Sequence, residues 1–239
     1  MKHSLLIAIT LCLYAVAVDG QTVIVVNNAA KQQQDPQVLL NNQGQLANTE
    51  IGAAQTVAGT FQTGTCCKST CFEAWATKPS CLVYSPTMTL PKLKNGVTHG
   101  GQTGNVTQQT LNDVTSHEDF RMTIYQTTAT VVNNFAASVA TTLESLCYAN
   151  KDDAKTELGI AYQNFLTTQV LNAFFGIANP AQASLNNNAT GEHGFVQNGV
   201  WIEPAQGALR AQISQTINNS NPDIEWVEDT NPDNKPLCQ

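Results

Sequence analysis

Apolar residues recur with a helical period in two consecutive runs between residues 116 and 177. The first run keeps spacings of three, four and seven, which place its members on one stripe of a helix: Phe120, Ile124, Val131, Phe135, Val139, Leu143 and Leu146. The second run follows a charged turn and comprises Leu158, Tyr162, Phe165, Leu166, Val170, Phe174 and Ile177. Because a short polar connection joins the runs, we expect an antiparallel helical hairpin.

Local signals mark the ends of these and two further helices. Thr115 and Glu118 fit a capping box that opens the first arm, and Pro180 should close the second. A helix from Pro36 to about Phe61 is favoured by Leu39, Leu46, Ala53 and Val57, with a solvated linker as the alternative for its amide-rich part. A last helix should open at Pro204, with Leu209, Ile213 and Ile217 on one face. These patterns predict a mainly α fold of the α+β class, a disulfide-stapled helical bundle built on the long hairpin.

Short extended segments interrupt the helical pattern. The block 63–112 should form a small β-containing insertion, with strands at Cys81–Tyr84 and Met88–Leu90 and a hairpin turn at Asn95-Gly96. Gly100, Gly101 and Gly104 should then release the chain as a loop. Asn198-Gly199 predicts a second hairpin between Phe195 and Ile202.

The N-terminal part carries a β-branched run that prefers an extended conformation: Thr22, Val23, Ile24, Val25 and Val26. This run is either an edge strand of its own domain or an assembly strand that inserts into the sheet of a neighbouring copy. Residues 21–35 would then form an extended arm, and residues 36–239 a single mainly helical domain.

Residues 1–20 have the layout of a secretory signal peptide, with Lys2 and His3 before an apolar run from Leu5 to Val18. No later run holds eighteen consecutive apolar residues, so we expect a secreted, extracellular protein without a membrane span. The net charge of −7 argues against a nucleic-acid partner, which requires clustered cations.

Six cysteines remain beyond that segment, an even number typical of three disulfides in an oxidising compartment: Cys66, Cys67, Cys71, Cys81, Cys147 and Cys238. Their pairing stays open. Three sequons predict N-linked glycans at Asn105, Asn188 and Asn218.

The candidates for chemistry are weak. His99, His117 and His193 lie outside any catalytic motif and are expected at the surface. Asp229 to Asp233 resembles the opening of a calcium loop, but it lacks the glycine and the final glutamate that such a loop needs. Neither a catalytic site, a cofactor nor a metal is therefore expected. Aromatic residues outside the long helices pad the core or form a ligand platform: Phe72, Trp75, Phe195, Trp201 and Trp226.

Three functions are compatible with this sequence. The first is a secreted structural or interaction glycoprotein, a self-assembling subunit of a filament, coat or matrix, whose partners are further copies or other extracellular proteins. The second is a carrier that encloses an apolar ligand between Ile124, Phe135, Phe165 and Phe174. The third is a hydrolase with a scattered carboxylate site, for which Glu203, Glu225, Glu228 and Asp229 are candidates.

Overall fold

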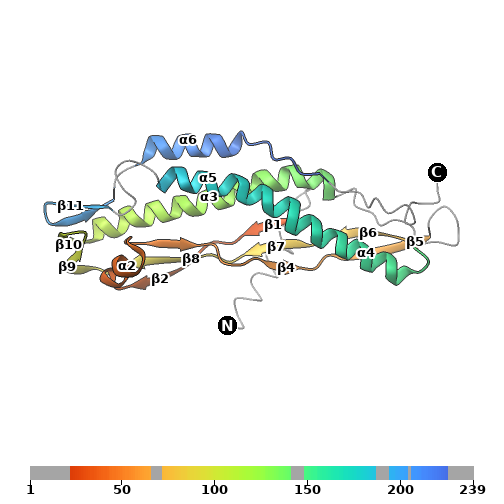
Figure 1. Ribbon diagram of the computed structural model, residues 1–239, viewed down its shortest axis with the longest axis horizontal. Coiled ribbons are helices and arrows are strands. Elements are labelled where there is room, and N and C mark those ends of the chain that lie inside the picture. Colours follow the sequence, from red (N-terminus) through yellow and green to blue (C-terminus); the bar gives the residue numbers. More distant parts are fainter. Residues whose placement is uncertain (1–21, 66–71, 141–147, 187–193, 204–205, 226–239) are drawn as a thin grey trace.

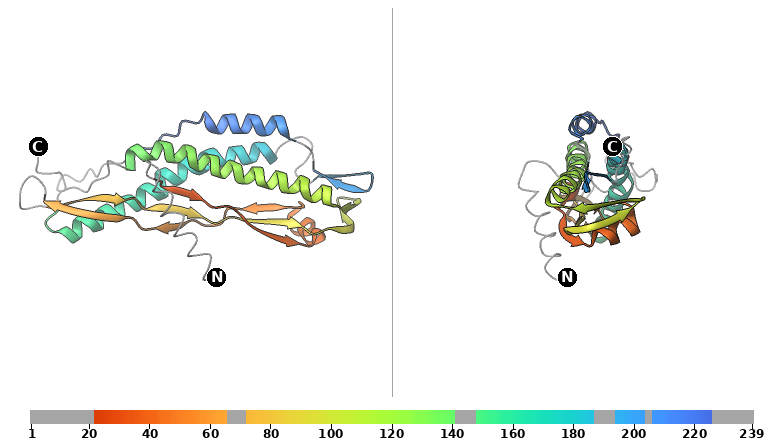
Figure 2. Two further views of the ribbon diagram at one scale, coloured as in Figure 1. Left: turned by 180° about the vertical axis from the view of Figure 1, so that it is seen from behind. Right: turned by 90° about the vertical axis from the view of Figure 1, so that its left-hand side faces the viewer.

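The computed structural model describes residues 22–65, 72–140, 148–186, 194–203 and 206–225. They form an elongated body of two layers, in which long helices lie over a narrow ribbon of short strands (Figure 1). The end-on view in Figure 2 shows the long helices stacked on one side of that ribbon. The described part holds twelve strands in four sheets.

The ribbon is three strands wide over most of its length. Its two three-stranded sheets have the orders β1-β7-β4 and β2-β8-β3, and the hairpin β5-β6 continues it. The outer strands β1 and β2 are parallel to the central strands β7 and β8. The outer strands on the other side, β4 and β3, are antiparallel to them. The strands are β1 (Ile24–Val26), β2 (Ala30–Gln34), β3 (Asn48–Glu50), β4 (Gln55–Val57), β5 (Thr60–Thr65), β6 (Phe72–Lys78), β7 (Cys81–Tyr84) and β8 (Thr87–Pro91).

A four-stranded sheet of order β11-β12-β10-β9 closes one end of the body. Its strands are β9 (Lys94–His99), β10 (Gln102–Val106), β11 (Phe195–Gln197) and β12 (Val200–Ile202). The hairpin at Asn198-Gly199 is confirmed, because both residues have positive φ and Gln197 pairs with Val200. The turn predicted at Asn95-Gly96 is wrong. Gly96 lies within β9, and the chain reverses at Gly100-Gly101, where both φ angles are positive.

The helices are α2 (Pro36–Gln43), α3 (Gln108–Ala140), α4 (Lys151–Asn164), the π-helix η1 (Phe165–Val170), α5 (Leu171–Asn186) and α6 (Gly207–Asn218). Because α4, η1 and α5 are contiguous, they make one long helix whose middle part has the wider π winding. The π segment widens each turn of backbone hydrogen bonds, so α5 presents its apolar face at a different angle from α4.

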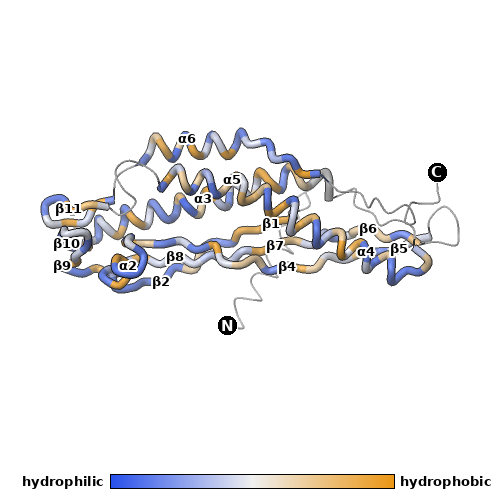
Figure 3. The backbone as a smooth tube through the Cα atoms, viewed as in Figure 1, coloured by the Kyte–Doolittle hydropathy of each residue, from blue (hydrophilic) through white to orange (hydrophobic). Residues whose placement is uncertain are grey.

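The prediction of a mainly α helical bundle is wrong. The two long helices exist, but their apolar faces pack on a ribbon whose strands run from Ile24 to Val106, and the β part is therefore no small insertion. The fold is a mixed α/β fold. Hydrophobic stretches on β1 and β7 lie beneath the helices (Figure 3), and Tyr84 of β7 stacks on Phe174 of α5 with ring centroids 5.6 Å apart.

The predicted helix from Pro36 to Phe61 ends much earlier. Asp35 caps its start by accepting a hydrogen bond from the Gln37 N–H, and Gly44 ends it in the left-handed conformation. The residues beyond Gly44 form β3, β4 and the start of β5.

The predicted ends of the two long helices are also wrong. The capping box fails because α3 already begins at Gln108, so Thr115 donates its hydroxyl to the Leu111 carbonyl instead. Pro180 lies inside α5, which continues to Asn186 because Ala181 and Leu185 stay buried against the core.

Candidate functional site

One side chain of α3 pairs with the outward backbone groups of Ile24 in β1. The Leu82 N–H donates to the Val23 carbonyl and the Asn27 N–H donates to the Tyr84 carbonyl. In a parallel pair this alternation turns the N–H and C=O of Ile24 away from β7. Asn133 pairs with both groups, since its Oδ1 accepts from the Ile24 N–H at 3.0 Å and its Nδ2 donates to the Ile24 carbonyl at 2.9 Å.

The predicted assembly strand Thr22–Val26 thus lies in its own chain's sheet. Val23 and Ile24 are fully buried, and Asn133 Oδ1 also accepts from the Val23 N–H at 3.0 Å. This arrangement matches the alternative in which the N-terminal run is an edge strand of its own domain.

We expect Asn133→Ala to lower the free energy of unfolding by about 2 kcal/mol, because it leaves the part-buried Ile24 N–H and C=O without partners. Urea unfolding followed by circular dichroism measures this loss. Asn134→Ala, at the exposed neighbouring position, is the control and should change stability by less than about 0.5 kcal/mol. Equal losses in both variants would show that the amide does not hold β1.

Among the described residues, no side chain pairs in this way with the outward backbone groups of β2. The Ala30 N–H donates to the Pro86 carbonyl and the Lys92 N–H donates to the Gln34 carbonyl, so Ala30, Gln32 and Gln34 face β8. The N–H and C=O of Lys31 and Gln33 point outward and have no hydrogen-bond partner among the described residues. All five residues of β2 are exposed.

A buried polar cluster joins α3 to the end of α5 and to the segment between β12 and α6. His117 Nε2 accepts a hydrogen bond from Arg121 Nε at 3.2 Å, so the imidazole proton resides on Nδ1, which faces Glu203 Oε1 at 3.4 Å. All three side chains are less than a tenth exposed. Arg121 also donates to Asn186 Oδ1 at 2.9 Å, which attaches the end of α5 to the same group.

The electrostatics of this cluster keep the imidazole neutral. Burial lowers the pKa of His117 to about 4, and the charges of Arg121 and Arg210 act in the same direction. Glu118 Oε1 lies 3.8 Å from Arg121 Nε, and Glu118 Oε2 accepts a hydrogen bond from the Thr49 hydroxyl at 2.6 Å. The cluster thereby links β3, α3, α5 and β12 through hydrogen bonds and opposite charges.

This cluster meets one requirement of the hydrolase hypothesis, a histidine beside an acid with a shifted pKa. It does not meet the other requirement, a position in a cleft. Neither the groove between α5 and α6 nor the one between β2 and the first part of α3 is lined by His117 or Glu203. The expectation that His117 lies at the surface is wrong, since it is 3% exposed. Sequence reasoning missed Arg121 and Arg210 altogether, because no motif connects them to His117.

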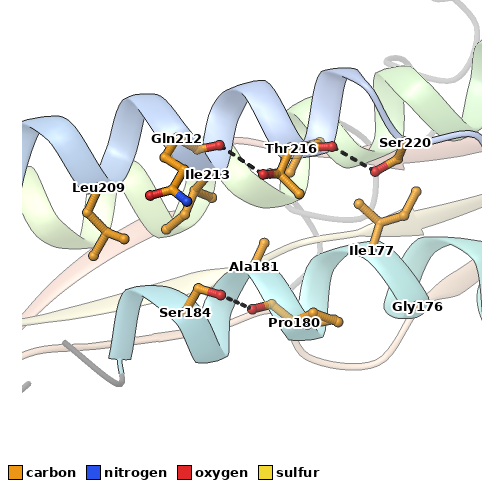
Figure 4. A pocket seen from close by; sticks show the side chains of 11 residues that line it. Gly176, Ile177, Pro180, Ala181, Ser184, Leu209, Gln212, Ile213, Thr216 and Ser220 are labelled. Carbon is orange, nitrogen blue, oxygen red and sulfur yellow. Dashed lines mark hydrogen bonds between the residues drawn. The ribbon is translucent and has the colours of Figure 1, made fainter.

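The residues of the carrier hypothesis line neither of these two grooves. Ile124, Phe165 and Phe174 are buried in the packed core, whereas Phe135 is 37% exposed. The groove between α5 and α6 is lined by other residues (Figure 4).

The remaining sequence candidates fall into two groups. Cys81 is the only cysteine among the described residues, and it is disulfide-bonded. Cys66, Cys67, Cys71, Cys147 and Cys238 lie outside the described residues, so no disulfide joins two described residues. His193, Asn188, Trp226, Glu228 and the stretch from Asp229 to Asp233 also lie outside them.

The other candidates can be placed. Asn218 is exposed at the end of α6, whereas Asn105 is half-buried in β10 and its Oδ1 accepts from the Gly96 N–H at 3.0 Å. Trp201 is 2% exposed and donates its indole N–H to the Val97 carbonyl, so it is a core residue. His99 is half-buried in β9. Glu225 is exposed.

Within the part of the chain that the structure describes, no helix has the length and apolar character that crossing a membrane requires. In the same residues no three His, Cys, Asp or Glu side chains gather where they could hold a metal ion. Comparisons with protein families, curated proteins and solved structures find no match for this chain.

Proposed function

We propose that this protein is a secreted structural or interaction glycoprotein that self-associates through the open edge of β2. The partner is a second copy of the chain that adds a strand to this edge. Assembly of this kind would build an extracellular filament, coat or matrix, with N-linked glycans at its sequons.

The contrast between the two outer strands on one margin supports this proposal. Asn133 occupies the outward N–H and C=O of Ile24, but the outward groups of Lys31 and Gln33 are left for another strand. Soluble proteins usually protect such an edge with charges, prolines or bulges. In β2 the one charge is Lys31, and its ammonium group is engaged by Asp119 at 2.8 Å.

The composition of β2 also suits addition of a second copy. Gln32, Gln33 and Gln34 are uncharged, and the side-chain amides of Gln33 and Gln34 can pair along stacked strands. If the β2 edges of two copies pair with each other in the antiparallel direction, no unpaired charge is buried between them.

Exchange of the strand Thr22–Val26 between copies is the second route. This strand would first have to leave β7 and Asn133 and expose Val23 and Ile24, at a cost of roughly 1.5 to 3 kcal/mol for each buried side chain. The outward backbone groups of β2 can accept a strand without losing any hydrogen bond that the structure describes. We therefore favour addition to β2.

We expect Gln33→Pro to abolish self-association without unfolding the protein. Proline removes the outward N–H of residue 33 and leaves the ladder between β2 and β8 intact, because residues 32 and 34 make that ladder. Sedimentation velocity over a range of concentrations measures association, and circular dichroism checks the fold.

Gln33→Ala is the matched control, since it removes the same side chain and keeps the N–H. It should still self-associate, because the N–H of residue 33 remains. A purely monomeric unaltered protein at high concentration, or association of Gln33→Pro equal to that of Gln33→Ala, would refute assembly through this edge.

A further inference from the structure

A groove of about 300 Å³ runs between α5 and α6 (Figure 4). Its surface is largely apolar, with Ile177 and Ala181 from α5 facing Leu209 and Ile213 from α6. The volume lies at the small end of the range for pockets that hold organic ligands. The groove is separate from the edge of β2 and from the buried cluster around His117, because it shares no lining residue with either.

The polar atoms along the groove are mostly hydrogen-bond acceptors. Each hydroxyl donates its proton to a carbonyl four residues earlier in its own helix, so its lone pairs remain for a ligand. These bonds run from Ser184 to Pro180 at 2.9 Å, from Thr216 to Gln212 at 3.0 Å and from Ser220 to Thr216 at 3.0 Å.

Pro180 adds another acceptor. In a helix the carbonyl of Gly176 would accept from the N–H of residue 180, but proline has no N–H. The Gly176 carbonyl is thereby left without its regular helical donor, and both residues line the groove. No residue in the lining is charged, and among its side chains the Gln212 amide supplies the N–H donors.

Glycine at position 176 leaves free space beside α5, although glycine lowers the stability of a helix. A methyl group built on Gly176 meets no atom within 4 Å, and the backbone there is ordinary helix. Glycine inside a helix is about 0.5 to 1 kcal/mol less favourable than alanine. A larger side chain would be tolerated sterically and would extend into the groove.

From these observations we propose that the groove binds a small neutral molecule with an apolar body and a hydroxyl group. The apolar walls cover the hydrocarbon part, and the acceptors along the helices receive the hydroxyl proton. A carboxylate of the same length is rejected, because it brings a second set of acceptors and finds no cation in the lining.

Fluorescence of N-phenyl-1-naphthylamine, a neutral apolar probe with one N–H, tests this site in the full protein. We expect a saturable rise in fluorescence that 1-decanol reverses at concentrations at least about tenfold lower than decanoate does, equivalent to about 1.4 kcal/mol. Gly176→Leu fills the groove and should weaken probe binding by at least about tenfold.

Gly207→Leu is the matched control. Gly207 also has no atom within 4 Å of an added methyl group, lies at the start of α6 and does not line the groove. This variant should bind the probe as the unaltered protein does. Absence of saturable binding, equal binding by Gly176→Leu and Gly207→Leu, or equal competition by decanol and decanoate would each overturn the proposal.

Discussion

Phe174→Ala should lower the free energy of unfolding by about 3 to 5 kcal/mol, the largest single effect expected for this protein. Phe174 is fully buried where α5 meets the ribbon. Its ring lies 5.6 Å from that of Tyr84 on β7, 6.2 Å from Tyr125 on α3 and 5.1 Å from Phe175. Removing it opens a cavity at the point where both layers and both long helices meet, so the loss includes dispersion contacts as well as apolar burial.

Urea or thermal unfolding of the purified protein measures this loss. Phe195→Ala is the matched control, because Phe195 in β11 is 37% exposed and should cost less than about 1 kcal/mol. Similar losses in the two variants would show that the interface between helices and ribbon does not determine the stability of the body.

The second large effect is a pH dependence that arises from His117. Its pKa is about 4 in the folded protein, against 6.5 in the unfolded chain, chiefly because burial disfavours the charged imidazole. Between these values the unfolded chain binds a proton that the folded protein does not. Stability therefore falls as the pH drops from 6.5 to 4, by about 3 kcal/mol in total, and this contribution is constant above and below that window.

The difference between the unaltered protein and His117→Gln isolates this contribution from that of the carboxylates. Denaturant unfolding should be measured for both proteins at several pH values from 7.5 to about 4. We expect the stability advantage of the unaltered protein over the variant to shrink by about 3 kcal/mol across the window. A difference that stays constant with pH would show that folding does not change the pKa of His117.

The long helices were predictable because each buries one continuous stripe, and a 3.6-residue period survives in the sequence whatever covers that stripe. The apolar spacing of residues 116 to 136 and 158 to 177 therefore sufficed to predict helices there. The sequence of a helix does not indicate which other element packs on its apolar stripe. The ribbon strands are three to seven residues long, too short for alternation to stand out from neighbouring loops.

Two errors follow from that shortness. Leu39, Leu46 and Val57 fit a helical period, but they belong to α2, to the loop before β3 and to β4. Asn95-Gly96 and Gly100-Gly101 both suit a tight turn, and the choice between them depends on pairing. His99 pairs with Gln102, whereas the Gly96 N–H is held by the Asn105 side chain.

The candidate sites depended still more on distant contacts. His117 and Glu203 are brought together by the packing of β12 on β10 and of α6 on α3, and neither residue carries a motif. The open edge of β2 could be foreseen as an extended N-terminal segment, but its outward groups follow from the register with β8. The groove depends on the proline within α5, which sequence reasoning took for the helix end.

The place of β1 also bears on the order in which the chain folds. Ile24 finds its strand partner in Leu82, and its edge is closed by Asn133, 109 positions further along the chain. During synthesis the first strand must therefore wait until more than half of the protein has emerged, and such distant contacts slow folding. Until α3 arrives, the valine-rich start is a nascent segment with no native partner on its outer side, and newly made chains are most prone to join one another in that interval.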